Sequence, residues 1–116
     1  MIRKENECMV EYREHMRDGN GTVQLTNFVA SPEELNNKGR LFAKLTLNPG
    51  CSIGYHIHDK DEEIFYILKG TAEYSDNGVI KTVTAGDVTI CPVGEGHGIA
   101  NNSDETVEFV AVILYE

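Results

Sequence analysis

The segment that decides the fold covers residues 50–70 and reads Gly-Cys-Ser-Ile-Gly-Tyr-His-Ile-His-Asp-Lys-Asp-Glu-Glu-Ile-Phe-Tyr-Ile-Leu-Lys-Gly. His56 and His58 are two residues apart, so on a β-strand both side chains point to one face, about 6.5–7 Å apart along the strand. Glu63 follows a short polar break and precedes an apolar run, 64–68, which predicts the next strand. The turn between these strands would return the Glu63 carboxylate to the histidines, and imidazoles beside a carboxylate are typical ligands of transition metals.

Length and composition predict one ordered globular domain. The chain has 116 residues, which allows a hydrophobic core that needs neither disulfides nor a structural metal to fold. Hydrophobic residues make up 41% of it, only 3 residues are proline, and no low-complexity tract occurs. We therefore expect disorder only at the ends.

The charge balance argues against nucleic acid and membrane partners. Asp and Glu total 19 against 10 Lys and Arg, and a formal charge of −9 repels phosphate backbones and anionic lipid head groups. The first residues lack the apolar core of a signal peptide, and no run of about 18 apolar residues is present. We expect a cytoplasmic protein whose partner is a small molecule. An anionic small molecule could bind despite the negative net charge if a bound cation contacts it.

Neither the cysteines nor the remaining N-terminal histidine indicates a further site. Cys8, Cys51 and Cys91 make an odd number without CxxC spacing, which favours buried reduced thiols over a redox role. His15 lies in a stretch of mixed charges, so we interpret it as a surface residue.

Short apolar segments separated by Gly, Asn and Pro turns recur along the whole chain and predict an all-β sandwich or barrel. One short helix is expected between the second and third strands, with Ser31 as N-cap, Pro32 at its first position and Glu34 completing a capping box. Besides the histidine segment, strands are predicted over 8–13, 22–29, 40–47, 64–68, 71–75, 79–83, 88–91, 97–101 and 106–115.

Two of these strands are apolar on both faces, which a strand with one solvent-exposed face would not be. They cover 64–68 and 107–114, where only Glu108 interrupts the apolar run. One face must line the interior while another element or subunit covers the other, so we predict a homodimer built on sheet-to-sheet contact. Alternation places the following side chains on the outer face: Tyr55, Ile57, Ile64, Tyr66 and Leu68.

Two spaced motifs in this order resemble those of the cupin superfamily, over most of the chain from about residue 41. The first, GxxxxxHxHxxxxExxxxxxG, is met by Gly50, His56, His58, Glu63 and Gly70. The second, GxxxxxPxGxxHxxxN, is met at every position by Gly86, Pro92, Gly94, His97 and Asn101. The resemblance implies a small cupin over 1–116, with N-terminal strands and the short helix in 1–40 and a jelly-roll β-barrel of two antiparallel sheets in 41–116.

The resemblance also implies that His56, His58, Glu63 and His97 bind one divalent metal ion. Three imidazoles and one carboxylate suit Mn, Fe, Co, Ni or Zn rather than Ca or Mg, which prefer more oxygen ligands. Alternation places Phe65, Ile67 and Ile99 on the ligand-bearing faces, so we expect them to line the pocket. Asn101 is expected beside it, either behind the ligands or in a turn.

Two functions of different classes remain open in the sequence, because cupins share one scaffold among many functions. The first is a metalloenzyme acting on a small oxygen-containing substrate, as a dioxygenase, isomerase or lyase. The alternative is a non-catalytic module that binds a metal or a small molecule. No catalytic residue beyond the metal ligands is indicated.

Overall fold

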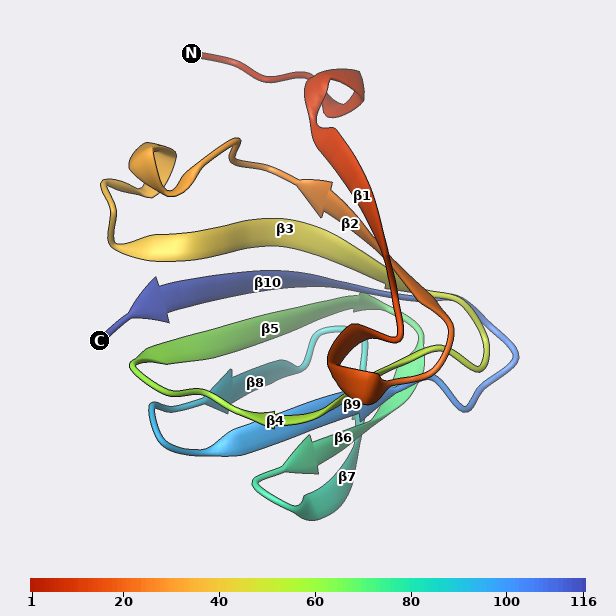
Figure 1. Ribbon diagram of the computed structural model, residues 1–116. Coiled ribbons are helices and arrows are strands. Elements are labelled where there is room, and N and C mark those ends of the chain that lie inside the picture. Colours follow the sequence, from red (N-terminus) through yellow and green to blue (C-terminus); the bar gives the residue numbers. More distant parts are fainter.

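Ten antiparallel strands in two sheets make up most of the computed structural model, which describes residues 1–116 (Figure 1). The strands are β1 (Met9–Glu14), β2 (Thr22–Asn27), β3 (Gly39–Leu47), β4 (Ser52–Ile57), β5 (Asp61–Lys69), β6 (Thr71–Asp76), β7 (Val79–Thr84), β8 (Val88–Cys91), β9 (Gly96–Ala100) and β10 (Val107–Tyr115). Three single-turn 3-10 helices accompany them: η1 (Glu5–Glu7), η2 (Met16–Asp18) and η3 (Pro32–Leu35). No helix has the length and apolar character needed to cross a bilayer.

The strand order is that of a jelly roll. The six-stranded sheet has the order β1-β2-β3-β10-β5-β8, and the four-stranded sheet has the order β4-β9-β6-β7. Pairings such as β3 with β10 and β4 with β9 bring segments that are far apart in the sequence side by side. The all-β jelly-roll prediction is confirmed as two antiparallel sheets, although strand pairing does not close them into one continuous barrel.

Alternating side chains build the core between the sheets. In β3 the apolar residues Leu41, Ala43, Leu45 and Leu47 all face inward, while the residues between them are exposed or half-buried, as the sequence predicts. They join a cluster of 17 buried hydrophobic residues contributed by both sheets. This core holds the inner faces of β4, β5 and β9 in fixed positions, and the candidate site lies on those faces.

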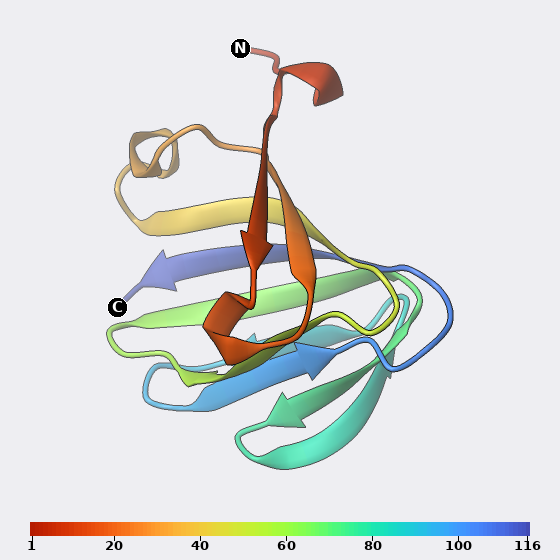
Figure 2. The same cartoon turned by 45° about the vertical axis from the view of Figure 1, so that its right-hand side comes forward.

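The N-terminal hairpin reaches across to the smaller sheet. Strands β1 and β2 pair at the edge of the large sheet, and the η2 turn between them folds down beside β4 (Figure 2). Two glycines permit this close approach: a Cβ atom on Gly54 would overlap the carbonyl oxygen of Arg17, and one on Gly19 would overlap that of Ser52. The β1–β2 hairpin is thereby held against the strand that carries His56.

The predicted short helix is present, but its capping differs from the expectation. Residues Pro32–Leu35 form a 3-10 turn, and the Ser31 side chain makes no capping hydrogen bond. Glu34 does not complete a capping box with Ser31, because its carboxylate accepts from the backbone N–H of Ala30 and forms an ion pair with Arg3. A long-range ion pair has replaced the local cap.

The five side chains predicted to share one outer face lie on two different sheets. Ile64, Tyr66 and Leu68 are on β5 of the large sheet, whereas Tyr55 and Ile57 are on β4 of the small one. A single flat contact therefore cannot cover all five. The cysteines are all free, and only Cys91 is fully buried.

Candidate metal centre

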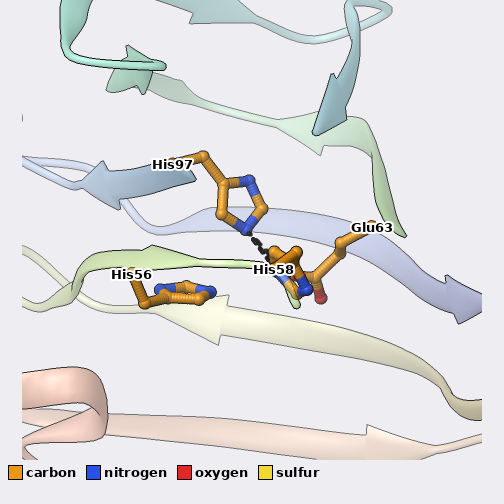
Figure 3. A group of neighbouring side chains, drawn as sticks. All are labelled: His56, His58, Glu63 and His97. Atoms are coloured by element: carbon orange, nitrogen blue, oxygen red, sulfur yellow. Dashed lines mark hydrogen bonds and ion pairs between the residues drawn. The ribbon is translucent and has the colours of Figure 1, made fainter. Parts of the chain in front are cut away.

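Four side chains from three strand regions converge between the sheets (Figure 3). His56 lies near the end of β4, Glu63 lies within β5 and His97 lies on β9. His58, predicted on the strand, is the first residue after β4, and its backbone is fixed by hydrogen bonds with Gly94 and Glu95. One ligand atom from each of the four lies within 4.8 Å of the others.

The strand pairing explains why the histidines meet. His56 is the direct partner of His97 in the β4–β9 ladder. A register shift between Ile53 and His56 lets both of these residues face inward although they are three apart. Phe65, two residues beyond Glu63 on β5, stacks on the His97 ring with centroids 4.9 Å apart. The rings are thus held by both backbone register and packing.

Each imidazole is oriented by a partner at its Nδ1 nitrogen. His56 Nδ1 donates to the carbonyl oxygen of Gly54 at 2.8 Å, and His58 Nδ1 donates to the Asp61 carboxylate at 2.6 Å. His97 Nδ1 contacts the Tyr74 hydroxyl at 2.9 Å. Because a carbonyl and a carboxylate can only accept, the neutral forms of His56 and His58 must carry the proton on Nδ1 and present an Nε2 lone pair.

This arrangement fits a bound cation. Nε2 of His58 lies 3.1 Å from both Glu63 Oε1 and His97 Nε2, and His97 Nε2 lies 3.0 Å from Glu63 Oε1. A neutral His58 would bring an acceptor lone pair against a carboxylate, which is unfavourable unless a proton or a metal ion lies between them. The donor set of three imidazoles and one carboxylate suits a divalent transition metal.

The pKa values reflect the same geometry. The hydrogen bond with Glu63 raises the pKa of His58. Burial raises the pKa of Glu63, but hydrogen bonds from His58 and His97 outweigh it and lower the value to about 2. Burial lowers the pKa of His56 to about 4, since this ring has no carboxylate partner. At neutral pH the site therefore holds an ionised carboxylate and a neutral His56, as metal binding requires.

A cavity of about 450 Å³ opens beside the cluster. Of the four converging residues, His56, His58 and Glu63 line it. Its other walls come from the N-terminal hairpin, from β3 and from the core: Arg13, Glu14, His15, Met16, Arg17, Arg40, Leu41, Leu45, Ile53 and Ile113. It is therefore bounded by the β1–β2 turn as well as by the strands that carry the motifs.

The residues predicted to line the pocket lie elsewhere. Phe65, Ile67 and Ile99 are buried in the core, and none of them lines this cavity. Asn101 is also fully buried, where its amide donates to the carbonyl oxygens of Leu47 and Glu105. Asn101 was expected either behind the metal ligands or in a turn. In the structure its side chain fixes the turn after β9.

The basic wall of the cavity was not predicted from the sequence. His15 was expected on the surface, yet it lines the cavity together with Arg13, Arg17 and Arg40. His15 is solvent-exposed, as expected, but at the cavity mouth. The hairpin 8–29 was predictable, but no local signal in it indicates that its turn packs on β4.

Comparison with known proteins identifies the family. The family model described as "Cupin domain" matches residues 43–113, more than half of the chain. The chain belongs to the cupin family. Both motifs of this cupin lie inside the matched region, and the β1–β2 hairpin lies outside it.

The cupin is similar to a relative of nearly the same length. The oxalate-binding protein of Thermotoga maritima is 40% identical over 114 residues, which cover 98% of this chain and 93% of that protein. A crystal structure described as a predicted oxalate decarboxylase from Thermotoga maritima matches with a TM-score of 0.94 and 40% identity over 100% of both chains.

A more distant structure matches in fold alone. The cupin domain of Cnp3 from Schizosaccharomyces pombe matches with a TM-score of 0.73 at 15% identity, covering 92% of this chain and 69% of that chain. Such a likeness carries no information on ligand or activity.

Proposed function

We propose that this cupin binds one divalent transition metal, such as Mn, Fe, Co, Ni or Zn, and holds a small carboxylate ligand beside it. The observation that carries the proposal is the convergence of His56, His58, Glu63 and His97, whose ligand atoms lie within 4.8 Å of one another. Four protein ligands leave positions open on an ion that prefers six, and a ligand oxygen can occupy them.

The cavity walls favour an anionic ligand. Three of the four arginines in the chain, Arg13, Arg17 and Arg40, line this cavity in a protein whose net charge is −9. Guanidinium groups suit the paired oxygens of a carboxylate. The name of the 40%-identical Thermotoga maritima relative, an oxalate-binding protein, supports oxalate as the first ligand to test.

A metalloenzyme acting on a small oxygen-containing substrate is the second candidate, and one observation favours it. Glu14 and His15 line the same cavity as the candidate metal ligands and can move protons at a bound substrate. A bound metal supplies Lewis-acid polarisation of substrate oxygens, or oxygen activation in an oxygenase. The chemistry would be of the isomerase, lyase or dioxygenase type.

The metal content of untagged protein purified without chelators tests the first proposal. We expect about one transition-metal ion per chain, and His58→Ala should remove it while the β-sheet circular dichroism spectrum persists, because the core does not depend on the ion. Asp59→Ala, an exposed neighbour, is the matched control and should keep the metal. A His58→Ala variant that fails to fold would show a structural role instead.

Oxalate then separates the two candidates. Isothermal titration of the metal-loaded protein should detect oxalate binding, and prolonged incubation should leave the oxalate intact if the protein only binds it. Consumption of oxalate, or of O2 with other small substrates by the iron-loaded protein, would support the enzyme. Absence of binding to metal-loaded protein would contradict the carboxylate proposal.

A further inference from the structure

Arg40 lines the cavity and is hydrogen-bonded to Asp61, the carboxylate that orients the candidate metal ligand His58. Its Nε donates to Asp61 Oδ2 at 3.0 Å. The other oxygen of the same carboxylate, Asp61 Oδ1, accepts from His58 Nδ1 at 2.6 Å. A continuous chain of two charge-assisted hydrogen bonds therefore runs from the cavity wall to the imidazole whose Nε2 faces the cluster.

The two ends of this chain differ in exposure. The Asp61 and His58 side chains are 10% and 2% exposed, so water competes little for their hydrogen bond. The Arg40 side chain is 40% exposed and lines the cavity. The inner half of the chain is fixed by burial, and the outer half is accessible to a ligand.

Arg40 also keeps most of its hydrogen-bonding capacity. A guanidinium has five N–H donors, and only the Nε–H of Arg40 is used. The terminal nitrogens remain available to a carboxylate, which a guanidinium binds through two parallel hydrogen bonds. One side chain can therefore hold Asp61 and a ligand at the same time.

The other cavity arginines lack this connection. The guanidinium of Arg13 contacts Glu11, and that of Arg17 makes no side-chain hydrogen bond or ion pair. Neither guanidinium is hydrogen-bonded to a side chain that orients a histidine of the cluster. Arg13 thus provides a matched comparison, since it has the same charge and lines the same cavity.

We propose that Arg40 is a positioning residue that couples the ligand cavity to the metal centre through Asp61 and His58. The inference deepens the proposed function and depends on it for the identity of the ligand. A carboxylate held by the terminal nitrogens fixes the guanidinium, the guanidinium fixes Asp61, and Asp61 keeps the His58 lone pair directed at the metal. Because such coupling is reciprocal, a bound metal strengthens ligand binding by the same factor.

A double-mutant cycle on metal affinity tests the link without any ligand. The affinity for Co(II) is measured by competition with a chelator for the wild type, Arg40→Gln, Asp61→Asn and the double variant. We expect each single change to weaken binding roughly tenfold, in the range usual for residues that orient metal ligands. The double variant should be no weaker than Asp61→Asn, because Arg40 acts through Asp61.

The visible spectrum of bound Co(II) adds a readout that general destabilisation would not move. Arg40→Gln and Asp61→Asn should change its ligand-field bands alike, and Arg13→Gln should change neither spectrum nor Co(II) affinity. Additive effects in the double variant, or an equal loss in Arg13→Gln, would overturn the proposal, because either shows that only charge matters. Circular dichroism of the metal-free variants checks that all of them fold.

Oxalate supplies the second arm. In the wild type, oxalate should increase the affinity for Co(II). In Arg40→Gln the factor of this increase should be about tenfold smaller. Arg40→Lys keeps the positive charge but lacks the planar pair of N–H donors of a guanidinium. Its Co(II) affinity should therefore recover in part, but oxalate should increase that affinity less than in the wild type. If oxalate increases the Co(II) affinity of Arg40→Gln as much as that of the wild type, the coupling is overturned. A wild type that binds Co(II) but not oxalate would contradict the proposed function. The ligand-free cycle would then still test whether Arg40 acts on His58 through Asp61.

Discussion

At the scale of single residues, the histidines of the cluster differ in what their Nδ1 atoms contact. His58 faces a carboxylate, His97 a hydroxyl and His56 a backbone carbonyl. The carboxylates of Asp61 and Glu63 stabilise the protonated form of His58, whereas burial of His56 destabilises its protonated form. The metal-free protein therefore responds to acid in opposite ways at His56 and at His58.

The depressed pKa of His56 predicts a pH-dependent loss of stability in the metal-free protein. Between its ordinary value of 6.5 and the folded value of about 4, the unfolded chain binds a proton that the folded chain does not. The His56 contribution is fully present above pH 6.5 and is lost as the pH falls toward 4. From pH 7 to pH 5 this should cost roughly 1–2 kcal/mol.

Urea unfolding in the presence of chelator, at pH 7 and pH 5, measures this loss. His56→Gln should lose less stability over the interval than the wild type. His58 works in the opposite direction, since its raised pKa adds stability that is complete below pH 6.5 and fades above it. An identical slope in His56→Gln and the wild type would contradict the prediction.

At the scale of elements, the seam between η2 and β4 holds the basic wall of the cavity in place. Gly54 and Gly19 have no room for a Cβ, so the backbone of η2 touches the backbone of β4. Gly54 also lies at the register shift that turns both Ile53 and His56 inward. The same short stretch thus sets both the orientation of His56 and the position of Arg17.

Gly54→Ala should separate η2 from β4. Because the added methyl would overlap the Arg17 carbonyl oxygen, we expect a loss of roughly 1–3 kcal/mol of stability, as for other overpacked sites, together with weaker oxalate binding. Gly78→Ala, in the β6–β7 hairpin, is the control: its Cβ meets open space, so it suffers only from its positive φ and should keep normal oxalate affinity. Unchanged oxalate binding in Gly54→Ala would show that η2 does not shape the site.

The elements that could be predicted from the sequence are those with local signals. Alternation over 40–47 predicts the inward face of β3, and the expected Gly and Asn turns include Asn77 and Gly78, which connect β6 to β7. The resemblance of the two motifs to those of cupins implied that His56, His58, Glu63 and His97 belong to one site, and in the structure they converge.

The features that were missed depend on tertiary contacts. The register shift in β4 occurs at Gly54, and an interior glycine can mark a bulge but does not show which residues pair across the ladder. The ion pair of Arg3 with Glu34 joins residues 31 positions apart. The arginines of the cavity come from β1, from η2 and from β3, so a local pattern could not group them. The alternation of side chains along β5 predicted that Phe65 faces inward, and it does. It could not predict whether an inward residue packs in the core or lines the cavity.

At the scale of the whole molecule, the large sheet leaves an apolar outer face uncovered. Across strands β3, β10, β5 and β8, side chains on this face lie in register, as in the row Phe42, Val112, Ile64 and Ile90. Several are substantially exposed, including Tyr66 at 47% and Ile90 at 55%. We propose that a second copy of the chain covers this face.

Changing Tyr66 to lysine should disrupt such a dimer. Light scattering of the wild type should give twice the chain mass of 12.9 kDa, and Tyr66→Lys should shift it toward the monomer, since a charge would be buried in the contact. Ile57→Lys, on the outer face of the small sheet, is the control and should remain dimeric. Monomeric wild type, or dissociation by Ile57→Lys alone, would contradict the assignment of this face.

The contribution of converging side chains from both sheets has a topological consequence. Glu63 belongs to the six-stranded sheet and His97 to the four-stranded one, 34 residues further along the chain. An ion bound to both would close a loop containing β6, β7 and β8, and such a closure removes freedom from the unfolded chain as a disulfide does. In the metal-loaded protein the ion would thus act as a reversible cross-link, one that a chelator can open without breaking a covalent bond.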